Sequence, residues 1–139
     1  MKKLALIFLA LIMVFSMAAC GGNDSGSGSG TVISVEIDID YPDASGIADV
    51  EDFVMEVPEG TNALEMLEMY CDENDIEMLM ATGSPTEYVT SINGVAESAD
   101  AGWVYEVNDE MTMEAADKCV LTEGMGITWE YMSWAEMGD

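Results

Sequence analysis

TVISVEIDID, at residues 31–40, alternates apolar and polar side chains from Ile33 onward. The apolar residues fall on one face of an extended chain and the serine and acids on the other, which is typical of a half-buried β-strand. Residues 51–57 alternate again, and the segment from Tyr41 to Gly46 between the two runs is rich in turn residues. We therefore expect the two runs to pair as a β-hairpin.

A helix is predicted directly after the hairpin. Asn62 is followed three residues later by Glu65, which is the pattern of a capping box. Apolar residues then recur at helical spacing as far as Cys71, with acids between them. The helix should cover one face of the sheet.

Further along the chain, four segments are predicted to be extended: residues 76–80, 87–92, 102–107 and 126–132. Two strands, one helix and several more strands around a single core indicate an α+β domain. The predicted fold is a β-grasp-like mixed sheet with one covering helix.

The beginning of the chain indicates export. Lys2 and Lys3 precede an apolar run at residues 4–15, and the small residues that end at Cys20 resemble the processing site of a bacterial lipoprotein. We predict a lipoprotein signal peptide at residues 1–19, a lipidated Cys20 with a flexible Gly/Ser-rich tether to residue 30, and a folded domain at residues 31–139. The domain would then lie on the extracytoplasmic face of the cell membrane. One alternative is an uncleaved membrane anchor, but the apolar run falls short of the roughly 20 residues that a spanning helix requires. The other is an ordinary secretory leader, and in either case the domain is exported.

The composition excludes several classes of function. All 28 acidic residues but only one lysine follow Cys20, which gives that part a formal charge of −27. Such a surface repels nucleic-acid phosphates. The chain has no histidine, which removes Ser-His-Asp and Cys-His catalytic pairs and histidine-bound metals. We expect neither an enzyme nor a nucleic-acid partner.

Two cysteines lie in the predicted domain, Cys71 and Cys119. Outside the cytoplasm they can oxidise to a disulfide. Two buried free thiols are the other interpretation.

No metal site is predicted. Asp38, Asp40 and Asp43 suggest a calcium loop, but Asp43 stands where such a loop needs glycine, so we expect a solvated acidic strand edge. Closely spaced methionines such as Met78 and Met80 could bind a soft metal ion. We interpret them as filling core space, the commoner role of methionine.

Four motifs follow one another between residues 57 and 134: PEGT at 58–61, YVTSINGV at 88–95, GWVY at 102–105 and GITW at 126–129. Together they resemble the transcobalamin-like C-terminal domain, a bacterial family related to the β-domain of the vitamin B12 carriers transcobalamin and intrinsic factor. In these carriers the β-domain closes over one side of a corrinoid. The resemblance implies a transcobalamin-like domain at residues 31–139 whose strand edges meet a corrin ring. The residues implied are Thr90, Ser91, Gly102, Trp103, Tyr105, Ser133 and Trp134.

The aromatic residues suit a planar ligand independently of the resemblance. Five large rings occur within a short stretch, and they combine flat apolar area with polar edges. They are Trp103, Tyr105, Trp129, Tyr131 and Trp134. A place in the core is the alternative for each ring. Trp134, which lies past the last alternating run, is the better surface candidate.

The sequence thus predicts a lipid-anchored extracellular binding module that contacts cobalamin or a related corrinoid and carries no covalent cofactor. The alternative is a surface protein–protein interaction module attached to a transporter or a cell-surface scaffold.

Overall fold

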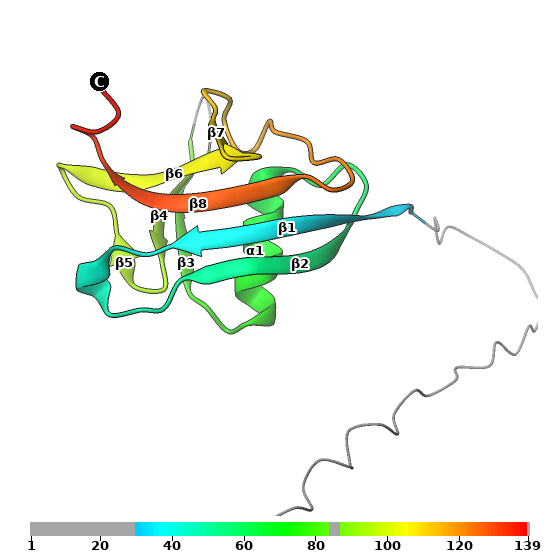
Figure 1. Cartoon of the computed structure of the whole chain (residues 1–139), viewed down its shortest axis with the longest axis horizontal. Helices are drawn as coiled ribbons and strands as arrows, with labels where there is room; N and C mark the ends of the chain where they lie inside the picture. The colour runs from blue at the N-terminus through cyan, green and yellow to red at the C-terminus, as the bar shows by residue number, and fades with distance from the viewer. Residues whose placement is uncertain (1–29, 84–86, 139) are drawn as a thin grey trace, which may run out of the picture.

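The computed structural model describes residues 30–83 and 87–138 (Figure 1). Cys20, the predicted signal peptide and residues 20–29 of the predicted tether lie outside the described residues. Within those ranges, none of the helices combines the length and the apolar character that crossing a membrane requires. The elements in chain order are β1 (Val32–Asp40), a 3-10 turn η1 (Asp43–Ser45), β2 (Val50–Pro58), α1 (Ala63–Glu73), β3 (Met78–Ala81), β4 (Tyr88–Ile92), β5 (Val95–Ala96), β6 (Ala101–Val107), β7 (Glu110–Met111) and β8 (Gly126–Ser133).

The strands form a larger mixed sheet and a smaller antiparallel one. The larger sheet has the order β2-β1-β8-β6-β7, in which β1 and β8 run parallel and the other neighbours run antiparallel. The predicted β1–β2 hairpin and the α+β class are confirmed. The sequence did not indicate that β3, β4 and β5 form a separate sheet of their own.

The alternating pattern of β1 decides which of its faces is buried. Its apolar residues from Ile33 onward point inward, with Ile37 and Ile39 fully buried, while the polar residues between them are partly exposed. β1 lies between β2 and β8, so the prediction of an acidic strand edge is wrong. The acids of β1 instead lie on the outer face of a central strand. The prediction failed because alternation indicates which face of a strand is buried but not which strands pair with it.

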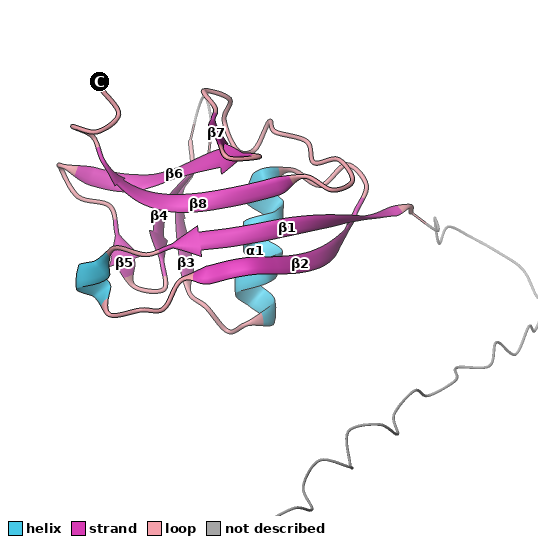
Figure 2. Cartoon of the chain, viewed as in Figure 1, coloured by secondary structure: helices cyan, strands magenta, loops and turns pink. Residues whose placement is uncertain are grey.

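Both hydrogen bonds of the capping box predicted for the helix are present. The Glu65 backbone N–H donates to Asn62 Oδ1 at 2.8 Å, and the Asn62 N–H donates to Glu65 Oε2 at 3.0 Å. The helix packs behind the large sheet, on the same side as the small sheet (Figures 1 and 2). Inward-facing residues of both layers, Leu64 and Leu67 among them, belong to one hydrophobic core, as predicted.

Candidate functional site

Trp134 lies directly after β8 and covers the start of β6. Its backbone N–H donates to the Asp100 carbonyl at 2.9 Å. A Cβ atom on Gly102 would stand 2.5 Å from Cζ2 and Cη2 of the Trp134 ring, so glycine alone leaves room for the ring there. The tryptophan is nevertheless 39% exposed. We call Gly102, Ser133 and Trp134 the Trp134 surface; Ser133 pairs with Ala101, next to Gly102.

Two inward-facing rings support this end of the sheet from below. The Trp103 indole N–H donates to the Val95 carbonyl at 2.8 Å, and the Tyr131 hydroxyl donates to the Ala96 carbonyl at 3.0 Å. The two rings meet edge to face with their centroids 5.4 Å apart. Trp103 is only 7% exposed. These contacts fasten β5 to the large sheet beneath the Trp134 surface.

Three further residues are implied by the resemblance, namely Thr90, Ser91 and Tyr105. The Thr90 carbonyl accepts a 2.7 Å hydrogen bond from the N–H of Glu97, in the connection that leads into β6. Ser91 is buried in the small sheet. Tyr105 is also buried, and its hydroxyl donates to the Glu114 carbonyl at 2.6 Å. Gly102, Trp103, Ser133 and Trp134 are therefore brought together, whereas Ser91 and Tyr105 are turned inward. The role of all seven in ligand contact stays a prediction.

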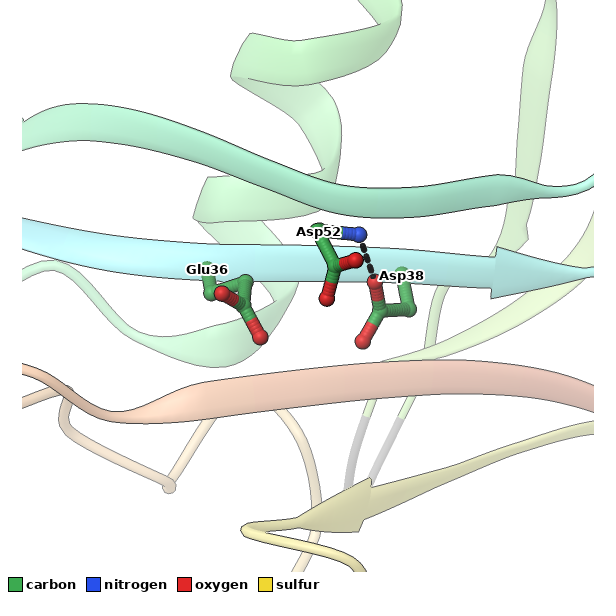
Figure 3. Close-up of side chains that lie close together, drawn as sticks. All are labelled: Glu36, Asp38 and Asp52. Carbon is green, nitrogen blue, oxygen red and sulfur yellow. Dashed lines mark hydrogen bonds between the residues drawn. The ribbon is translucent and has the colours of Figure 1, made fainter.

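The outer face of the large sheet is acidic. Carboxylate oxygens of Glu36, Asp38 and Asp52 lie within 4.8 Å of one another, and the Asp52 N–H donates to Asp38 Oδ1 (Figure 3). Asp52 takes a positive φ of 52° opposite an irregularity between Ile37 and Ile39. Sequence reasoning grouped Asp38 with other acids of its own segment and missed Asp52, because the contact depends on this irregular pairing. Exposed acids often gather without an ion, so the cluster by itself assigns no metal.

Partial burial and mutual repulsion affect two carboxyl groups on this face. Partial burial raises the pKa of Glu130, and the neighbouring carboxylates of Glu106 and Asp40 raise it further. The pKa of Asp40 is also raised, first by partial burial and then by Asp49, Asp38 and Glu51. These carboxyl groups therefore hold their protons more tightly than free carboxyl groups do.

A cavity of about 580 Å³ lies elsewhere, between α1 and β3. We call it the α1–β3 groove. Its lining residues are Thr61, Glu65, Glu68, Met69, Cys71, Asp72, Ile76, Met78 and Met80. Three methionines, Met69, Met78 and Met80, thus border this groove. They are partly buried and pack against the hydrophobic core, which agrees with the expectation that methionine fills core space.

The two cysteines of the domain are free and buried, which agrees with the second of the two interpretations. Burial raises the pKa of Cys71 to about 11, and the nearby Asp72 carboxylate adds to the effect. Burial likewise raises the pKa of the Cys119 thiol. Both thiols therefore remain protonated at neutral pH, which makes them poor nucleophiles.

Comparison with known proteins places the chain in a family. The domain of unknown function DUF4430 matches residues 60–133, which nearly coincide with the residues 57–134 that carry the resemblance noted in the sequence. No curated protein is significantly similar to the chain in sequence.

Two solved structures share the fold. Haptocorrin in complex with Cbi aligns with a TM-score of 0.65 and 19% identity over 75% of this chain, which spans only 26% of the haptocorrin chain. A Ruminococcus gnavus ATCC 29149 protein described as a "putative metal binding protein" aligns with a TM-score of 0.55 and 14% identity, over 73% of this chain and 97% of its own. From this family match, and from the transcobalamin-like fold that its domain shares with haptocorrin, we conclude that the chain belongs to the DUF4430 family.

Proposed function

We propose that the protein is a lipid-anchored, extracytoplasmic binding module that contacts cobalamin or a related corrinoid through the Trp134 surface. The observation that carries the proposal is the exposed Trp134 ring held over Gly102. It is supported by the fold shared with haptocorrin, which was solved in complex with Cbi.

The Trp134 ring is suited to receive a flat ligand because it is held in place before the ligand arrives. The glycine beneath it and the backbone hydrogen bond to Asp100 both limit its motion. A ring that is already ordered loses little conformational entropy when it stacks on a ligand. Its flat apolar face would pack on the corrin ring, and nearby backbone groups would bond to the amide side arms of the corrinoid.

The buried residues of the predicted site would not contact the ligand and would instead fix the backbone that surrounds the Trp134 surface. Trp103 and Tyr131 hold β5, and Thr90 holds the connection into β6 through Glu97. In this proposal they keep the backbone around the Trp134 surface in one conformation. Ser91 and Tyr105 would belong to the same frame.

Three broader statements belong to the same proposal. The β-grasp description is supported by the parallel pairing of β1 with β8 beside the β1–β2 hairpin, with α1 across one face. Export and lipidation at Cys20 rest on the pattern of residues 1–30. A binding role agrees with the two structural neighbours, a haptocorrin solved in complex with Cbi and a protein described as metal binding.

Titration of the full chain in a neutral detergent with cobalamin and cobinamide, followed by absorbance and calorimetry, tests the proposal. We expect saturable binding that Trp134→Ala weakens by about 10-fold or more, the effect of losing an aromatic anchor. Tyr88→Ala, which removes a 51% exposed ring from β4, is the matched control and should bind as the unmodified chain does. Absorbance and heat that stay unchanged at millimolar ligand would refute the proposal.

The alternative function, protein binding, is favoured by a different surface, the α1–β3 groove.

A further inference from the structure

The α1–β3 groove combines an apolar floor with an acidic rim. Met69, Met78 and Met80 are partly exposed and line it. Glu68 and Asp72 lie on the α1 side of the same cavity. Methionine is flexible and polarisable, and it is common on surfaces that accept varied apolar partners. The volume of about 580 Å³ is within the range of roughly 300–1,000 Å³ that ligand cavities have.

No basic side chain among the described residues forms an ion pair with the acids at the groove. Among the described residues Lys118 is the one basic side chain, and it pairs at 3.4 Å with Asp117; neither of the two lines the groove. Partial burial raises the pKa of Glu68, and the carboxylates of Glu65, Glu87 and Asp72 raise it further. A positive group placed here would relieve repulsion that the free protein has to bear.

The groove also lies along a strand with an unused edge. In the described part of the chain β3 pairs with β4 alone, because the small sheet has the order β3-β4-β5. Figure 2 shows α1 on the side of β3 that faces away from β4. Free strand edges of this kind accept an extended peptide as an additional strand.

We propose that the α1–β3 groove binds an extended basic segment of a partner protein, in which lysine or arginine side chains alternate with apolar ones. The segment would pair with β3 through its backbone. Its basic side chains would reach Glu68 and Asp72, and their methylene groups and the apolar side chains would cover the methionines. A second copy of this chain does not fit this chemistry, since its formal charge beyond Cys20 is −27.

This binding is separate from the proposed corrinoid contact. None of the groove residues belongs to the Trp134 surface. Saturating the groove should therefore leave a corrinoid titration unchanged, and either proposal can fail without the other.

The test uses fluorescence anisotropy with the full chain in neutral detergent at low salt. The probe is a labelled octapeptide of alternating lysine and valine with blocked ends. We expect saturable binding that the double variant Glu68→Gln, Asp72→Asn weakens by about 10-fold or more. The matched control, Glu106→Gln with Glu130→Gln, removes the same charge from the outer face of the large sheet and should change the affinity by less than about 2-fold. An equal loss in both double variants would overturn the proposal, because net charge alone would then attract the peptide.

Two further probes test the strand addition. The same peptide with N-methylated backbone amides keeps its charges and side chains but cannot donate to β3, and we expect its binding to be lost. If it binds as well as the parent peptide, strand addition is refuted. Spermine tests whether the groove is only a site for small polycations. The proposal fails if spermine binds and the double variant Glu68→Gln, Asp72→Asn weakens that binding, while the peptide does not bind.

Discussion

The two faces of the β6–β8 pair use aromatic rings in opposite ways. On the inner face Trp103 and Tyr105 are buried, and the polar atom of each donates to a backbone carbonyl. At the outer face Trp134 follows the last residue of β8 and lies over Gly102, where it is 39% exposed. Rings that alternate along a strand thus pack the core, whereas a ring that follows the strand can be presented to a ligand.

The largest effect is expected from Trp103→Ala. Removal of this ring leaves a cavity against Tyr41 and Tyr131 and takes the hydrogen bond away from the Val95 carbonyl. We expect a loss of about 3–5 kcal/mol in the free energy of unfolding, measured by urea denaturation. Trp134→Ala should cost less than about 1 kcal/mol in the same assay. Equal losses of unfolding free energy in the two variants would mean that the inner and outer rings contribute equally to stability, which would contradict the comparison.

Gly102→Ala sharpens the comparison at the contact itself. The added methyl group would stand 2.5 Å from the Trp134 ring, so the ring must move away. We expect the free energy of unfolding to fall by about 1 kcal/mol. Quenching of tryptophan fluorescence by acrylamide, a neutral quencher, should become stronger, and the change reports on Trp134 because Trp103 and Trp129 are buried. Gly126→Ala is the control, because its new Cβ meets nothing closer than 3.8 Å. Unchanged quenching in Gly102→Ala would show that the ring does not rest on this glycine.

The smallest effect concerns the acidic outer face. The pKa of Glu130 is raised in the folded protein, so the folded state binds protons more tightly than the unfolded state. The resulting stabilisation is complete below the ordinary carboxyl pKa and is lost as the pH rises through the raised value.

Glu130→Gln should therefore raise the unfolding midpoint at pH 7 by about 2–4 °C and flatten its dependence on pH above 4.5, measured by thermal melts. Glu59→Gln removes an acid from the exposed turn after β2 and controls for net charge. A midpoint that Glu59→Gln raises equally would assign the effect to overall charge rather than to this face.

The sequence predicted what local patterns encode. The alternation around Ile37 specified the buried face of β1, and the Asn62–Glu65 pair specified the start of α1. It did not predict the second sheet or the Glu36–Asp38–Asp52 cluster, since both depend on which strands pair and on an irregular register. Trp134 was predicted as the surface ring because alternation stops before it. Its contact with Gly102 joins residues 32 positions apart, which no local pattern reports.

The parallel pairing of β1 and β8 has a consequence for orientation. Both strands start at one end of the large sheet, so Trp134 lies beyond the opposite end from Val32. Nine residues of strand separate the two ends by roughly 30 Å. If Cys20 carries the lipid, the chain from the membrane joins the domain at the end of the sheet that lies opposite Trp134, so the Trp134 surface is separated from the point of attachment by the length of the strands.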